Sequence, residues 1–74
     1  MRIKNEMYSS LLQKYESEIQ ESKTTLMIFF EQSVGIGDHS NHIEEMDEIV
    51  AKMSSSHDKL MMLKLVFENT YSKL

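Results

Sequence analysis

The sequence predicts an all-α protein, an antiparallel hairpin of two long helices. Three observations support this fold class. Apolar residues recur every three or four positions in both halves of the chain, which is the spacing of one helical face. Proline, which breaks or kinks helices, is absent from the sequence. Both glycines, Gly35 and Gly37, lie near the middle of the 74 residues, where a turn would reverse the chain.

The first half of the chain predicts one helix over about residues 4–32. Glutamate, lysine and glutamine occupy the face opposite its apolar stripe, as in a helix that buries one side. At 1.5 Å per residue such a helix is roughly 43 Å long. The stripe consists of Ile3, Met7, Leu11, Tyr15, Ile19, Ser22, Leu26, and Phe29 or Phe30.

Residues 33–40 are expected to form the turn. Gly35 and Gly37 can adopt positive φ at little cost, so either can end the first helix. We expect Val34 and Ile36 to fold back onto the end of the helix pair. A G-x-G can also belong to a phosphate-binding loop, but here no strand precedes it and no third glycine or P-loop lysine follows. The turn motif comprises Phe29, Phe30, Val34, Gly35, Ile36, Gly37, Asp38 and His39.

The second half predicts a helix over about residues 41–73. Asp38, Ser40 and Asn41 are all good N-cap residues, and Asn41 lies three positions before Glu44, a capping-box spacing. The acidic residues that follow favour the positive end of the helix dipole. The serines at 54–56 could break the helix and give a three-helix arrangement, but the apolar phase runs through them and favours a continuous helix. The stripe is Ile43, Met46, Val50, Met53, His57, Leu60, Lys64, Phe67, Tyr71 and Leu74.

The composition predicts more apolar surface than one hairpin can bury. A chain of 74 residues is close to the lower limit for an independent core, and without cysteine it has no disulfide to stabilise it. Between Leu60 and Phe67 the second helix is apolar nearly all round. We therefore expect two hairpins to pair into a four-helix bundle, as a homodimer or another homo-oligomer. The expected interface residues are Met53, Leu60, Met61, Phe67 and Tyr71.

Two histidines beside the turn are the strongest metal-ligand candidates. His39 and His42, with Asp38 and Glu45, could supply nitrogen and oxygen ligands. Polar helix N-termini carry such residues without a metal, and no H-E-x-x-H spacing occurs. The sequence therefore predicts no metal and no cofactor.

Catalytic motifs are missing from the sequence. There is no cysteine nucleophile and no G-x-S-x-G elbow. The adjacent residues Ser56, His57 and Asp58 would fan around a helix instead of converging. We therefore expect a protein that is not an enzyme.

The charge balance disfavours nucleic-acid binding. The net charge is −4, from 8 basic and 12 acidic side chains, and an acidic chain is repelled by phosphate backbones. The basic residues of the first half are interleaved with glutamates, which is typical of a solvated face. The candidates for nucleic-acid contact are Arg2, Lys4, Lys14 and Lys23.

No segment predicts contact with a membrane. The longest apolar run, Leu26 to Phe30, is too short to span a bilayer. Polar residues follow the basic start of the chain, unlike in a signal peptide. We expect a soluble, cytoplasmic protein, and the lack of cysteine fits a reducing compartment.

A pattern centred on the turn carries a family resemblance. It spans roughly residues 22–65 and consists of Leu26, Phe29-Phe30-Glu31 and Val34-Gly35-Ile36-Gly37-Asp38-His39, followed by Ile43 and Asp58-Lys59-Leu60. This pattern resembles a family of small proteins of T4-like bacteriophages that are encoded beside the UvsW recombination helicase. The family is helical and is likened to nucleic-acid-binding modules attached to helicases. The acidic net charge of this chain does not fit nucleic-acid binding. It is compatible with an accessory role in which the protein binds a phage or host protein in the host cell cytoplasm.

Three functions follow as hypotheses. The first is a non-catalytic, self-associating helical interaction module, accessory to phage recombination or repair. The second is a nucleic-acid-binding accessory factor of a phage helicase, acting through the four basic residues named above. The third is a small phage inhibitor of a host protein, including a defence protein, with the acidic second helix as a decoy surface.

Overall fold

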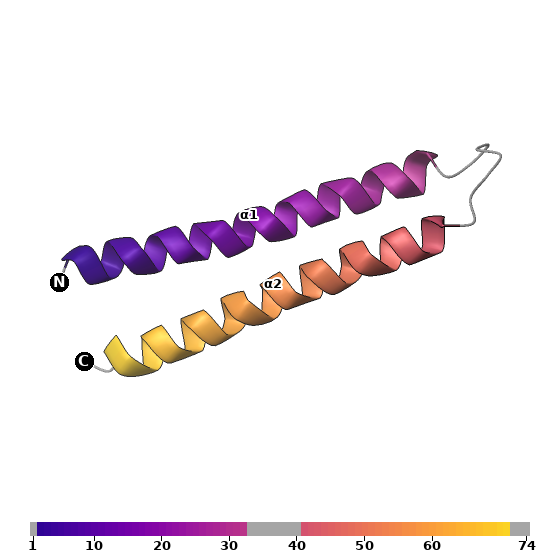
Figure 1. Ribbon diagram of the computed structural model, residues 1–74. Coiled ribbons are helices and arrows are strands. Elements are labelled where there is room, and N and C mark those ends of the chain that lie inside the picture. Colours follow the sequence, from indigo (N-terminus) through magenta and orange to yellow (C-terminus); the bar gives the residue numbers. More distant parts are fainter. Residues whose placement is uncertain (1, 33–40, 72–74) are drawn as a thin grey trace.

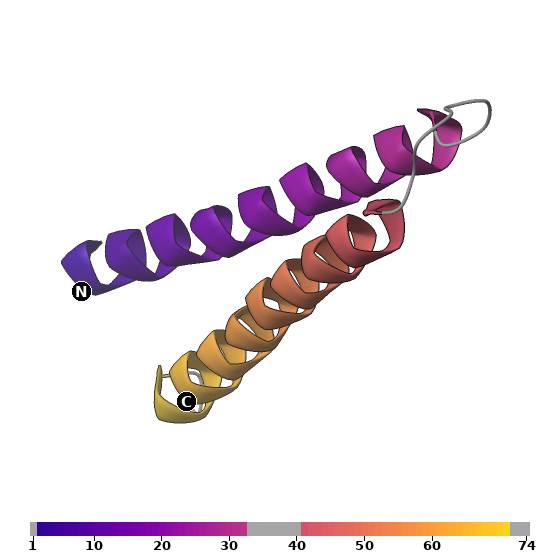
Figure 2. The same cartoon turned by 45° about the vertical axis from the view of Figure 1, so that its right-hand side comes forward.

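The protein is an antiparallel helical hairpin, as the sequence predicts. The computed structural model describes residues 2–32 and 41–71. Helix α1 is Arg2–Gln32 and helix α2 is His42–Tyr71. The two helices lie side by side along their whole length and run in opposite directions (Figure 1). In the view of Figure 2 they are inclined to each other. The molecule is 58 Å long and 16 × 14 Å in cross-section.

Helix α2 continues without interruption through Ser54–Ser56. The three-helix alternative is therefore wrong, because serine is a moderate helix former and Ser56 packs against α1 within the helix. At the start of α2 the Glu45 amide donates to the Asn41 carbonyl oxygen at 2.9 Å. That carbonyl accepts the first intrahelical bond, so Asn41, one of the three candidates, occupies the N-cap position. The predicted turn at 33–40 lies outside the described residues.

Each helix contributes a seam in which contact residues alternate at spacings of four and three. This is the heptad spacing of a coiled coil. The side chains at these positions are buried or half-buried. The seam of α1 is Lys4, Tyr8, Leu11, Tyr15, Glu18, Ser22, Thr25 and Phe29, and that of α2 is His42, Met46, Ile49, Met53, Ser56, Leu60, Leu63 and Phe67.

The seam of α2 differs in part from the predicted stripe. Met46, Met53, Leu60 and Phe67 belong to both, but the predicted Ile43, Val50 and His57 are exposed. Ile49 and Ser56 face α1 beside them. Apolar residues spaced three and four apart can be assigned to two possible seams that share every second residue. Apolar content favours the register with Val50, whereas close approach of two backbones favours the one with a small serine.

Small polar residues hold the centre of the hairpin. Ser22 and Ser56 are only 4% and 3% exposed, and Leu60 is the one large apolar side chain that is buried among the described residues. Within the same residues, every buried side-chain nitrogen and oxygen has a hydrogen-bond partner. The least exposed of the described side chains are therefore two serines, and most of the apolar side chains keep some contact with water.

Candidate interaction surfaces

A polar contact joins the two helices at mid-length. The Ser56 hydroxyl donates to a Glu18 carboxylate oxygen at 2.9 Å, and the Lys14 ammonium lies 2.6 Å from the other oxygen. The Lys14 and Ser56 hydrogen bonds lower the pKa of Glu18, and the Glu18 hydrogen bond raises the pKa of Lys14. The sequence analysis missed this contact. Its local signal is the Lys14–Glu18 spacing of four residues, which places the two side chains on one helix face.

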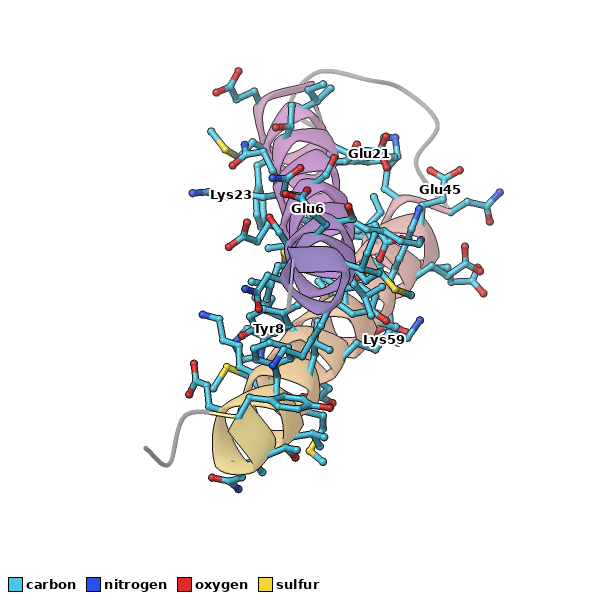
Figure 3. All side chains as sticks on the ribbon, turned by 90° about the vertical axis from the view of Figure 1, so that its left-hand side faces the viewer. Glu6, Tyr8, Glu21, Lys23, Glu45 and Lys59 are labelled. Carbon is cyan, nitrogen blue, oxygen red and sulfur yellow. The ribbon has the colours of Figure 1, made fainter. Side chains whose placement is uncertain are left out.

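One side of the seam is charged along the middle of the hairpin, while the exposed Met7, Ile28 and Val66 lie on the same side nearer the helix ends. The residues on this side immediately precede every second seam residue. Those seam residues are Tyr8, Tyr15, Ser22 and Phe29 of α1 and Met46, Met53, Leu60 and Phe67 of α2. Lys52 Nζ lies 3.9 Å from Glu21 Oε1 across the two helices. Glu21, Glu45 and Lys59 point to the same side of the hairpin, and Lys23 points to the other (Figure 3). We call Lys14, Glu21, Glu45, Lys52 and Lys59 the charged flank.

The other side of the seam is apolar. Ile43 and Val50 of α2 are 75% and 42% exposed, and the leucines and isoleucine of α1 on this side are half-buried. The apolar flank consists of Leu12, Ile19, Leu26, Ile43 and Val50. Toward the chain termini the same line of α2 continues with His57 and Lys64.

A hollow of about 330 Å³ lies along the apolar flank. Ile19 of α1 forms one wall of it. The α2 residues Met53, Ser54, His57 and Asp58 form the remainder. The serines at 54–56 thus act in two ways. Ser56 permits close approach inside the seam, and Ser54 leaves space on the outside.

The chain termini lie at the open end of the hairpin (Figure 1). This end carries an aromatic cluster. The rings of Tyr8 and Phe67 stack with their centroids 3.7 Å apart and their planes 5° from parallel. Tyr71 packs against Phe67 at 4.9 Å, and the Lys4 ammonium lies 3.9 Å from the centre of the Tyr71 ring. Desolvation and the negative charge of Glu68 raise the pKa of Tyr8.

An open groove of about 780 Å³ borders the aromatic cluster. Leu11, Leu63 and Met7 supply apolar walls, and Lys14 lies at its edge. At the opposite end of the hairpin, the rings of Phe29 and His42 meet edge to face, with centroids 5.6 Å apart. Aromatic contacts therefore join the helices at both ends of the seam.

The five residues predicted for a dimer interface are unequally accessible. Leu60 is buried within the hairpin, and Met53 and Phe67 are half-buried in the seam. Met61 and Tyr71 are 51% and 49% exposed. Of the five, these last two remain open to a second chain, and their place in an interface stays a prediction.

The nucleic-acid candidates do not gather into one basic surface. Lys14 is paired with Glu18, and Lys4 lies over the Tyr71 ring. Lys23 points to the side opposite the charged flank (Figure 3). The description of Arg2 extends to its backbone only. The described cations are thus separated or neutralised.

The metal and turn candidates are only partly described. His42 contacts Phe29, whereas His39 and the Val34 to Asp38 part of the turn motif lie outside the described residues. Within residues 2–32 and 41–71, no three histidine or acidic side chains gather closely enough to hold a metal ion. In the same part of the chain, neither helix is long and apolar enough to cross a membrane.

Comparison of the chain with protein-family models, curated proteins and solved structures found no match. The resemblance to the phage family therefore remains an expectation drawn from the turn residues.

Proposed function

We propose that this protein is a non-catalytic helical interaction module that acts by self-association. The observation that carries the proposal is the distribution of its large apolar side chains. Leu60 alone is buried, while twelve others are exposed within the described residues. Single exposed apolar residues are ordinary on protein surfaces, but a hairpin that buries only one large apolar side chain among its described residues has a small core.

Exposed apolar residues occur on both helices. On α1 they include Met7, Ile28 and Phe30, and on α2 they include Val50 and Leu65. Two helices have one seam, so the remaining apolar stripes are covered only when further helices pack on them. A second hairpin supplies two such helices, and the product is a four-helix bundle.

Concentration dependence of folding tests the proposal. A self-associating hairpin unfolds at a higher temperature as its concentration rises, because mass action favours the associated folded state. We expect the midpoint of thermal unfolding, followed by far-ultraviolet circular dichroism, to rise over about a hundredfold increase in concentration. A midpoint that stays constant over this range, with a cooperative helical transition, contradicts the proposal.

The biological setting is a separate proposal that the resemblance alone supports. It places the module in phage recombination or repair, bound to a phage or host protein. The separated cations Lys4, Lys14 and Lys23 favour a protein partner over nucleic acid. Binding assays with single-stranded and branched DNA at low salt distinguish the two kinds of partner. Salt-dependent binding of either DNA would contradict the proposal that the partner is a protein and not nucleic acid.

A further inference from the structure

We infer that the apolar flank, Leu12, Ile19, Leu26, Ile43 and Val50, is the face on which a second copy of this chain docks. The inference rests on the proposed self-association and names the surface that carries it. Two hairpins then lie side by side, flank against flank, with the charged flank of each in water. Such a pairing is isologous, so each residue of the flank enters the interface twice.

Along the middle of the hairpin, the contrast between the charged flank and the apolar flank selects the face. On the charged flank, Glu21 and Lys52 form an ion pair across the helices, and both side chains are mostly exposed, at 72% and 63%. Covering that side would remove these charges from water at a cost that an exposed ion pair does not repay. The apolar flank contains no charged side chain, and the charged residues beside it on α2 are Asp58, at the hollow, and Lys64.

The surface of the flank is also shaped for packing. The hollow between Ile19 and Met53 is open to solvent on this side and has a volume of about 330 Å³. An apolar side chain from a second hairpin can enter it, as a knob enters a hole in a helix bundle. The flank extends beyond the hollow through Leu26, Val50 and Ile43, which favours contact along the helices over contact at their ends.

The size of the accessible surface fits a partner of this kind. The chain exposes 5945 Å². A compact monomer of 8.7 kDa exposes roughly 4,700 Å², so this hairpin has an excess of about 1,200 Å². A standard interface buries about 800 Å² on each partner. Covering one flank with a second hairpin is thus of the right magnitude to remove most of the excess.

A pair of matched substitutions on α2 tests the face. Val50 lies on the apolar flank and Val66 on the other side of the seam, and they are 42% and 58% exposed. Val50→Glu and Val66→Glu make the same change in charge and size. In sedimentation velocity of the full chain, we expect Val50→Glu to weaken dimerisation about a hundredfold or more, since two buried carboxylates would enter each interface. Val66→Glu should leave the dissociation constant within about threefold of wild type.

Tryptophan variants at the same positions keep the test decisive if a glutamate variant unfolds. The chain has no tryptophan, so the fluorescence of Val50→Trp or Val66→Trp reports the surroundings of that one position. On raising the concentration, emission from Val50→Trp should shift to shorter wavelength as dimer forms, and emission from Val66→Trp should stay unchanged.

The outcomes separate the face from the self-association. If the wild-type chain associates but the Val66 variants respond and the Val50 variants do not, the assigned face is wrong and the proposed function stands. If the wild-type chain is a monomer at every concentration and remains folded, both are wrong.

Discussion

Ser56 of α2 donates its hydroxyl hydrogen to Glu18 of α1 at 2.9 Å, in the part of the hairpin where side chains are least exposed. The contact is charge-assisted, and Lys14 compensates the carboxylate from its other side. A small side chain and a satisfied charge thus occur together at mid-length. This explains why a serine takes a seam position that apolar periodicity gives to its neighbours.

Enlarging Ser56 should destabilise the hairpin. Ser56→Leu places a bulky side chain where only 3% of the serine is exposed, and overpacking of this kind costs about 1–3 kcal/mol. Chemical denaturation followed by circular dichroism measures the change in the free energy of unfolding. Ser55→Leu is the matched control, because Ser55 is exposed one position away. Equal effects of the two substitutions would show that the seam runs elsewhere.

The Glu18 contact should make stability depend on acid pH. The pKa of Glu18 is lowered in the folded state below its ordinary value of 4.5, first by the Lys14 hydrogen bond and then by the Ser56 hydrogen bond. The stabilisation is therefore present above pH 4.5 and is lost as the pH falls through the lower folded value. Glu18→Gln should reduce the unfolding temperature at neutral pH, and its difference from wild type should shrink below pH 4.5.

The aromatic contact at the open end should contribute to stability. Phe67 stacks on Tyr8 and touches Tyr71. Truncating a core phenylalanine costs about 3–5 kcal/mol, and for the half-buried Phe67 we expect the lower end, about 3 kcal/mol. Phe67→Ala should lower the free energy of unfolding by this amount and weaken the near-ultraviolet circular dichroism of the tyrosines. Val66→Ala, at a site 58% exposed, should change stability by less than about 0.5 kcal/mol. A Phe67 variant as stable as the Val66 variant would contradict the assigned packing.

The surface ion pair should matter little. Lys52 and Glu21 are 3.9 Å apart and mostly exposed, and such pairs typically contribute less than about 1 kcal/mol. Lys52→Ala should therefore change the unfolding temperature less than Ser56→Leu does, and added salt should remove the difference from wild type. A loss as large as that of Ser56→Leu would show that this flank is buried.

The overall fold could be predicted because the sequence gives consistent local signals. Apolar spacing, the absence of proline and the position of Asn41 together specify two helices and the start of the second. These signals depend on neighbours within a few residues. The predicted first helix, 4–32, lies within α1, and α2 begins one residue after the predicted start at 41.

The seam register could be predicted only in part. Apolar periodicity favours Val50 over Ser56 as a seam residue, because it depends only on which residues are apolar. The seam register also depends on how closely the two helix backbones can approach. That distance is set by pairs far apart in sequence, such as Glu18 with Ser56 and Tyr8 with Phe67. A single sequence does not reveal which of two overlapping registers forms those pairs.

The mass of the folded chain in solution tests the central claim most directly. Sedimentation equilibrium of the full chain in the micromolar range should give about 17 kDa, twice the 8.7 kDa of one chain. A mass of 8.7 kDa at every concentration, with the helical signal intact, would contradict self-association.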